Sequence, residues 1–407
     1  MTVGRKFGDW VLSYRNGYGK RPAAGELGPI VLRIADVSSG RIDLSNPRRG
    51  SVSAKEAETY RLQTGDLLFV RVNGAREIVG RCCVVGPEVP PDTVFNDHLI
   101  RVRLSPGVDP DFARLCVSVP SARALIEEAA STSAGQLTIS QQVLDSIEVP
   151  AIPIAEQRKI VARLSAQLVE VEAAQQAAVV QSKAFDALLA AIYREAFAQV
   201  VPVAVPPTFG EPPPGWQWHK LNDVARLESG HTPSRSRPEW WGGDVSWLSL
   251  TEIRALDGQW VESTRLRTNA SGIANSAARI LPRGTVCYSR TASVGFVAIM
   301  AKPMATSQDF ANWVCGDALD PEFLMHALIR VRKQLRELAS GATHKTIYMP
   351  TLESFHICAP DPDIQRSIVL ALNRRLTETT ALQSALDAQQ TELATLPRRL
   401  LSQAFEN

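Results

Sequence analysis

Residues 138–197 read TISQQVLDSIEVPAIPIAEQRKIVARLSAQLVEVEAAQQAAVVQSKAFDALLAAIYREAF, and a second copy of this stretch occupies residues 346–405. The two copies align without a gap and share about 19 of 60 residues, so an internal duplication is the first feature to interpret. Identities include Gln157 with Gln365, about a third of the way along each copy, and Phe197 with Phe405 at the end. The chain is therefore predicted to consist of two related halves.

The second part of each copy predicts a long helix. Mostly apolar or small side chains recur in alternating steps of four and three residues, a seven-residue period typical of a coiled coil. The first series is Leu164, Leu168, Val171, Gln175, Ala178, Ser182, Phe185, Leu189, Ile192 and Ala196, and the second is Leu372, Leu376, Thr379, Gln383, Leu386, Gln390, Leu393, Leu400 and Ala404. A helix over 154–197 would be about 65 Å long. Its single apolar stripe needs a partner, and the other copy is the nearest candidate.

The glutamines and the proline among the predicted interface positions lead to two further predictions. Gln175 and Gln383 are polar, so they cost stability but can fix the register of the pair. Pro397 predicts a kink. The simpler alternative is that each helix packs only on its own domain.

The regions outside the helices repeat one order of elements. In the first, strands are expected at 31–34, 65–71, 82–85 and 99–104, followed by a helix over 109–130. In the second, strands at 245–250 and 284–290 precede a helix over 321–338. Gly284 corresponds to Gly65, and Gly295 to Gly80.

These patterns predict an α+β chain in which two mixed α/β domains are joined by two long antiparallel coiled-coil helices. The expected boundaries are 1–150 for the first domain, 151–200 for the first helix, 201–215 for a linker, 216–360 for the second domain and 361–407 for the second helix. Six prolines in 201–215 predict a semi-rigid linker.

Composition and motifs exclude several functions. The net charge of +2 gives no overall basic field, and the six cysteines form no CxxC pair, so a zinc site or a disulfide framework is not expected. No NPPY-like methyltransferase motif, HExxH or GxSxG is present, and Gly17-Tyr18-Gly19-Lys20 is too short for a phosphate-binding P-loop. Residues 1–10 lack the apolar core of a signal peptide, and no apolar run could span a bilayer, so a cytoplasmic location is expected.

The ordered set of motifs resembles the specificity subunit of type I restriction–modification systems. The residues that carry the resemblance are Trp216, 230–234 (GHTPS), 241–248 (WGGDVSWL), 284–290, 293–295, Gln308, the PxxEQ helix entry at 153–157, and the two Ala-Phe exits. Two departures exist. The second helix entry, at 360–365, lacks the Glu, and the first domain has no clear counterpart of the 216–234 opening.

This resemblance implies two target-recognition domains, each reading one half of a split sequence in double-stranded DNA, with the helix pair as a ruler for the unread spacer. It implies no catalytic residues, cofactor or metal on this chain. S-adenosylmethionine and ATP would be bound by its partners, the modification (methyltransferase) subunits and the restriction (translocase and nuclease) subunits.

DNA reading needs hydrogen-bond donors on loops held by a rigid scaffold. The candidates follow the two Gly turns, line the polar loop before Trp240, or precede the repeated Thr-Ile. They are Arg71, Asn73, Arg76 and Gln136 in the first domain, and Thr232, Ser234, Arg235, Arg290, Thr291, Ser293, His344 and Lys345 in the second, with Lys20 and Arg21 as phosphate contacts. Each arginine could instead pair with a nearby acid, and the Trp240-Trp241 pair could anchor its loop rather than stack on bases.

Two other functions fit the same pattern. One is a protein-interaction scaffold that has two domains on a coiled-coil rod and does not bind DNA. The other is an orphan subunit whose partners have been lost.

Overall fold

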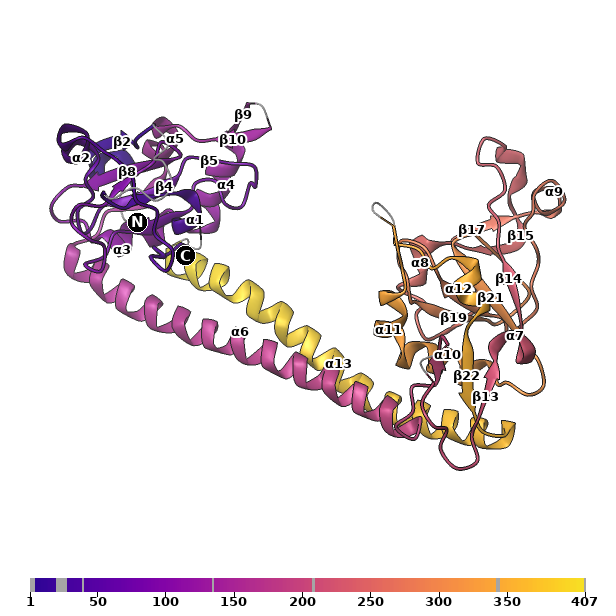
Figure 1. Ribbon diagram of the computed structural model, residues 1–407. Coiled ribbons are helices and arrows are strands. Elements are labelled where there is room, and N and C mark those ends of the chain that lie inside the picture. Colours follow the sequence, from indigo (N-terminus) through magenta and orange to yellow (C-terminus); the bar gives the residue numbers. More distant parts are fainter. Residues whose placement is uncertain are drawn as a thin grey trace. The chain divides into compact units, whose positions relative to one another are not determined.

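The structure, a computed structural model, describes residues 4–19, 28–38, 40–133, 135–206, 209–341 and 345–405. It forms two compact units (Figure 1). Unit 1 comprises residues 1–179 and 387–407, and unit 2 comprises residues 180–386. Each unit contains one globular domain, here domain 1 and domain 2, and part of both long helices.

The long helices are α6 (Ile154–Ala196) and α13 (Pro362–Phe405). All predicted seam positions are buried or half-buried, and every seventh residue from Leu164 to Ile192 in α6 is buried. Within each unit the two helices run side by side (Figure 1): Gln175 Nε2 donates to Leu393 O at 2.9 Å in unit 1, and Arg375 pairs with Glu195 at 2.8 Å in unit 2. The predicted fold class is confirmed.

Domain 1 is built on an antiparallel sheet of four strands in the order β2-β8-β4-β6. These strands are β2 (Val11–Asn16), β8 (Leu99–Leu104), β4 (Leu67–Val70) and β6 (Cys82–Val84). Smaller sheets join β1 (Gly4–Lys6) to β11 (Glu148–Pro150), β3 (Val31–Leu32) to β7 (Val94–Phe95), and β5 (Val72–Asn73) to β10 (Gln136–Thr138) and β9 (Ser131–Ser133). The short helices are η1 (Phe7–Trp10), α1 (Ile34–Val37), α2 (Ala54–Tyr60), α3 (Pro110–Cys116), α4 (Pro120–Ala129) and α5 (Gln141–Asp145).

Domain 2 repeats this plan with the order β14-β21-β18-β19 and adds β16 in parallel at the edge. These strands are β14 (Ala225–Ser229), β21 (Phe310–Cys315), β18 (Val286–Ser289), β19 (Val297–Met300) and β16 (Trp260–Val261). Two further sheets contain β17 (Leu266–Thr268), β15 (Trp241–Leu248) and β20 (Ala305–Thr306), and β12 (Val203–Ala204), β22 (His356–Ala359) and β13 (Gln217–Lys220). The short helices are α7 (Leu221–Val224), η2 (Pro238–Trp240), α8 (Leu250–Ile253), α9 (Ala270–Ala274), α10 (Pro321–Arg330), α11 (Arg332–Glu337) and α12 (Met349–Glu353).

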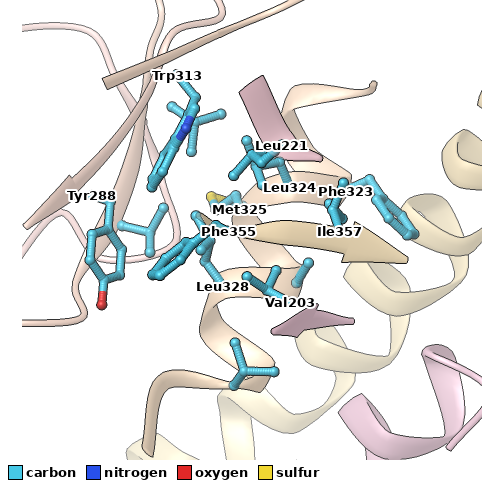
Figure 2. Close-up of a cluster of buried hydrophobic side chains, with 14 of the residues drawn as sticks. Val203, Leu221, Tyr288, Trp313, Phe323, Leu324, Met325, Leu328, Phe355 and Ile357 are labelled. Atoms are coloured by element: carbon cyan, nitrogen blue, oxygen red, sulfur yellow. The ribbon is translucent and has the colours of Figure 1, made fainter. Parts of the chain in front are cut away.

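Both domain cores include the ends of both long helices. In unit 2, Phe197, which directly follows α6, and Leu372 from the start of α13 belong to the cluster that Trp313, Phe355 and other buried side chains form in Figure 2. In unit 1, Leu164 from the start of α6 and Leu401 from the end of α13 belong to the core of domain 1. Neither helix therefore packs only on the domain that precedes it.

A buried glutamine attaches the start of each long helix to its domain. Gln365 is fully buried; its Oε1 accepts from the backbone N–H of Asp320, the N-cap of α10, and its Nε2 donates to the carbonyls of Ala318 and Pro360. Gln157 makes the same kind of contacts in unit 1, with the backbone of Asp109, Ile152 and Gly107. The glutamine of the PxxEQ motif is thus a structural clamp.

Unit 2 also has a buried polar network where α10 meets the long helices. His326 lies between the Tyr193 hydroxyl, 3.2 Å from Nδ1, and Asn373 Oδ1, 2.9 Å from Nε2. The Asn373 amide then donates to Glu322, which also accepts from the Trp260 indole. This network ties both long helices to domain 2.

The stability of unit 2 is expected to depend on the protonation of His326. Burial lowers the pKa of His326 below its usual value of about 6.5, so the unfolded chain binds a proton more readily than the folded chain. This contribution is fully present above pH 6.5 and is lost as pH falls below that value, by up to about 1.4 kcal/mol per pH unit. Chemical denaturation of the wild type and of His326→Gln at pH 8, 6 and 5 measures it. The two stabilities should diverge below pH 6.5, and parallel curves would contradict this explanation.

Several local predictions need correction. The strand expected at 31–34 ends at Leu32, because the Asp36 carboxylate accepts from the Arg33 backbone N–H and starts a helical turn. The helix expected over 109–130 is two helices, since Pro120 fits only the first turn of α4. The helix over 321–338 is likewise interrupted, at Val331, and the strand over 245–250 ends at Leu248.

The proline-rich stretch is packed on domain 2 rather than acting as a free spacer. Val203 and Ala204 are buried and form an edge strand beside β22, and the Pro202 carbonyl accepts from Cys358 N. Further along, the Trp218 indole donates to the Gly210 carbonyl. Among the helices that the structure describes, none is both long and apolar enough to cross a membrane.

Candidate nucleic-acid interface

The two predicted Gly turns deliver an arginine to the same place in each domain. Gly65 and Gly284 have positive φ angles of 90° and 85°, which suit glycine, and each lies against the proline that begins α3 or α10. The strands that follow, β4 and β18, are fully buried. Arg71 and Arg290 are therefore the first partly exposed residues after a rigid strand.

Both arginines hold neighbouring loops together through backbone carbonyls. Arg71 Nη1 donates to Asp97 O at 3.1 Å, and Arg290 Nη2 donates to Gln308 O at 2.8 Å. Arg290 Nη1 also lies 3.5 Å from Ile347 O. Burial lowers the pKa of Arg290, opposed by the nearby Asp309 carboxylate. The guanidinium groups thus brace the loops, and neither forms an ion pair with an acid among the residues that the structure describes.

The repeated Thr-Ile segment is the third loop at each site, after the loop that begins at Arg71 or Arg290 and the loop that contains Asp97 or Gln308. Ile139 N donates to Arg71 O, and Ile347 N donates to Arg290 O. In domain 1, Asn73 on β5 lies opposite Leu137 on β10, next to the exposed Gln136. Arg71, Asn73 and Gln136 are therefore brought together.

In domain 2 the same segment positions a lysine. Thr291 forms a β-bridge with Thr346, and Ala292 N donates to the carbonyl of the exposed Lys345. Ala292 has a φ of 55°, a conformation that costs energy in a residue other than glycine. The structure therefore brings Arg290, Thr291 and Lys345 together.

A fourth loop follows the first strand of each main sheet. A Cβ atom on Gly230 would lie 2.1 Å from Thr306 Oγ1, and one on Gly17 would lie 2.1 Å from Asn96 O, so both positions require glycine. His231 N donates to Thr306 O, and Tyr18 N donates to Phe95 O. Domain 1 therefore has a structural equivalent of the GHTPS loop, namely the Gly17-Tyr18-Gly19 stretch, although the two loops share only the first glycine in sequence.

Gln308 connects the fourth loop of domain 2 to the arginine. Its Oε1 accepts from Thr232 Oγ1 at 2.6 Å, while its backbone carbonyl accepts from Arg290. Beyond Thr232, Ser234 and Arg235 are exposed, and Arg235 has no side-chain partner among the described residues. The Trp241 indole donates to Ser234 O and its ring packs edge-on against the buried Trp247, so Trp241 anchors this loop.

Domain 1 has a polar cavity of about 400 Å³ at its site. Arg71 lines it together with Asn16, Gln142 and Asp145. The Tyr14 hydroxyl donates to Asp145 at 2.6 Å, and burial, followed by this carboxylate, raises the pKa of Tyr14. The cavity offers both donors and acceptors, as reading of base edges requires.

The remaining candidate DNA-binding residues either make other contacts within the domain or lie outside the described residues. Arg76 is exposed but donates to Glu127 O, and Ser293 forms a tight turn in which its carbonyl accepts from Ser289 Oγ. Lys20, Arg21 and His344 lie outside the described residues. DNA contact by each candidate stays a prediction.

Burial keeps cysteine thiols of both domains protonated. Burial raises the pKa of Cys358 to about 11 and of Cys83 and Cys315 to about 12, so these thiols are protonated and poor nucleophiles at neutral pH. Within the described ranges, no three His, Cys, Asp or Glu residues are grouped to hold a metal ion.

Sequence reasoning missed several residues of the site. Gln308 was among the residues that carry the family resemblance, and nothing else in the sequence indicated that it has a role in the site. Asn16, Gln142 and Asp145 carry no sequence signal, because they meet Arg71 only in the fold. Arg123 and Arg336, which donate to the carbonyls of Val79 and Val294 just before the paired Gly80 and Gly295, were also missed.

Comparison with known proteins finds chains that are similar to this one. Residues 213–389 match the family described as the type I restriction modification DNA specificity domain. The chain is 35% identical over 150 residues to the EcoKI specificity subunit of Escherichia coli K12, covering 37% of this chain and 32% of that one. It is 27% identical over 167 residues to the MjaIX specificity subunit of Methanocaldococcus jannaschii, covering 40% and 38%. These matches span about a third of the relatives' lengths.

A longer match and the structural comparison extend over nearly the whole chain. A putative specificity subunit, MjaX of the same archaeon, is 22% identical over 376 residues, covering 90% of this chain and 85% of that one. A solved chain from a study of assembly and conformational transition of the type I R-M system superimposes with a TM-score of 0.76 at 18% identity, covering 99% and 97%. The HsdS subunit from Thermoanaerobacter tengcongensis gives 0.54 at 18% identity, covering 100% and 96%. Residues 213–389 thus match the type I restriction modification DNA specificity domain, and the chain as a whole is similar in sequence and fold to specificity subunits of type I restriction–modification systems.

Proposed function

We propose that this chain is the DNA-recognition subunit of a type I restriction–modification complex, in which each domain reads one half of a bipartite sequence. The observation that carries the proposal is the repetition of one loop arrangement in two domains, one of which matches a DNA specificity domain. In each domain an arginine joins a rigid strand to two further loops. The two domains share the backbone arrangement of these loops but differ in the exposed side chains. This is expected if each domain recognises a different DNA sequence.

The differences between the domains support two distinct half-sites. Domain 1 offers Asn73 and Gln136 beside its arginine, and amide side chains suit adenine. Domain 2 offers Thr232, Arg235 and Lys345. The two halves would lie about one helical turn of DNA apart, roughly 10 bp between centres.

The absence of a catalytic motif in the sequence supports a division of labour. Modification subunits would bind S-adenosylmethionine and methylate the DNA, and ATP-driven restriction subunits would cleave it. The long helices α6 and α13 would dock the modification subunits and set the spacer between half-sites. A scaffold without DNA binding is not favoured, because it gives no reason for the matched loops.

Exposed cations of domain 2 test the proposal. Arg235→Ala and Lys345→Ala should each weaken DNA binding by the assembled complex, and should each reduce the slope of log affinity against log salt by about 1. Arg374→Ala is the matched control, since this exposed arginine pairs with Glu378 on its own helix. Affinity measured at several salt concentrations gives the result.

Sequence preference is the second part of this test. A complex of the wild-type chain should prefer one bipartite sequence, identified by sequencing methylated bases in a host that carries the complete system. Equal binding to all duplexes would contradict the proposal. So would a salt slope that neither Arg235→Ala nor Lys345→Ala alters while Arg374→Ala does.

A further inference from the structure

Pro397 leaves one backbone carbonyl of α13 without its usual partner. In an α-helix the N–H of residue 397 would donate to the carbonyl of residue 393, but proline has no N–H and its ring crowds that carbonyl. The helix nevertheless continues through Pro397 to Phe405. Leu393 O must therefore find a donor outside its own helix or remain unsatisfied.

Gln175 supplies that donor from the other helix. Its Nε2 lies 2.9 Å from Leu393 O, and the glutamine is half-buried in the seam between α6 and α13 in unit 1. A carbonyl within an unbroken helix is already paired and gains little from a second donor. Of the residues of α6 none is a proline, so the orphaned carbonyl arises on α13 only.

Two open surface grooves lie beside this bond. A groove of about 280 Å³ lies against Val171, Leu393 and Leu400, and a second of about 220 Å³ follows at Leu164 and Ala404. Apolar contacts are not directional, so they specify the axial position of one helix against the other less strictly than a hydrogen bond does. The hydrogen bond to Leu393 O does specify this axial position. The neighbouring carbonyls on that face of α13 are paired within the helix and offer Gln175 no equivalent acceptor.

We propose that Gln175 and Pro397 form a register lock, in which Gln175 recognises the one carbonyl that Pro397 exposes and so fixes the axial position of α6 against α13. Gln175 is then a positioning residue for DNA recognition, since the register sets the spacer that the two domains tolerate. This second step rests on the proposed function, whereas the lock itself does not.

A double-mutant cycle on the full-length chain tests the lock. Gln175→Leu in the wild type should lower Tm by about 2 to 6 °C, because a half-buried carbonyl loses its donor. In the Pro397→Ala background, the restored backbone N–H at position 397 pairs with Leu393 O, so Gln175→Leu should leave Tm unchanged or raise it. Gln383→Leu is the matched control, because Gln383 occupies the position equivalent to Gln175. Its effect should be the same in the wild type and in the Pro397→Ala background.

The result that overturns the lock is a Gln175→Leu effect of equal size in both backgrounds. Where the coupling is present, the spacer is measured next. The assembled complex with Gln175→Leu should accept targets whose spacer is one base pair longer or shorter at least about five-fold better than wild type does, with half-site preference unchanged. Unchanged spacer discrimination would overturn the positioning role.

Failure of the proposed function has a different signature. A wild-type complex without preference for any DNA sequence would remove the positioning role together with the proposed function. The thermal coupling between Gln175 and Pro397 is measured on the chain without DNA, so it separates that result from a failure of the lock.

Discussion

Replacing Gln365 with leucine is expected to lower the free energy of unfolding of unit 2 by about 3 to 5 kcal/mol. Leucine has a similar volume, so the change removes hydrogen bonds rather than packing. It leaves the part-buried N–H of Asp320, the part-buried carbonyl of Ala318 and the buried carbonyl of Pro360 without the partners that Gln365 provides. An unpaired group costs about 1 to 3 kcal/mol when it is fully buried and less when it is part-buried, so the three groups together give an expected loss of about 3 to 5 kcal/mol.

Matched variants separate this clamp from general helix effects. Gln157→Leu should destabilise unit 1 in the same way but by less, since one of its bonds, to Gly107 O, is long at 3.4 Å. Gln389→Leu, at an exposed position of α13, should change stability by no more than about 0.5 kcal/mol. Chemical denaturation of the full chain measures all three. A loss below about 1 kcal/mol in both clamp variants would show that other donors replace the glutamine.

The long helices could be predicted from the sequence because their signal is periodic and local. A seven-residue repeat specifies which side chains share a face, and the buried set from Leu164 to Ile192 follows it. The clamp was visible only as an identity between the copies, Gln157 with Gln365. Its meaning depends on the N-caps of α3 and α10, which are distant in sequence and contribute backbone atoms only.

The candidate site was less predictable because it, too, depends on contacts with backbone atoms of residues that are distant in sequence. Arg71 and Arg290 were found as arginines after a Gly turn, but their acceptors are the carbonyls of Asp97 and Gln308. A backbone carbonyl is present at every residue and leaves no mark on the sequence, so a brace resembles a DNA contact until the fold is known. The counterpart of the GHTPS loop in domain 1 was hidden likewise, because only Gly17 is shared and the hydrogen-bond pattern defines the rest.

Arg290→Lys is expected to abolish reading of one half-site although it keeps the charge. The Arg290 guanidinium donates to Gln308 O at 2.8 Å and lies 3.5 Å from Ile347 O in the Thr-Ile segment, and a lysine ammonium lacks the planar fork that spans these two carbonyls. Gln308 in turn positions Thr232. We expect affinity for the cognate duplex to fall at least about ten-fold, with loss of base preference in the half-site of domain 2 and none in the other half.

The charge-conserving change distinguishes a brace from a phosphate contact. If Arg290 only neutralised a phosphate, lysine would bind almost as well, and Arg290→Leu would reduce the salt slope by about 1 without altering base preference. Arg71→Lys is the mirror experiment, because Arg71 donates to Asp97 O in the equivalent place, and it should affect the half-site of domain 1. Binding of the assembled complex to duplexes varied in one half at a time measures both. Wild-type preference in the two lysine variants would mean that the loops keep their positions without the fork, and that the arginines serve the DNA backbone instead.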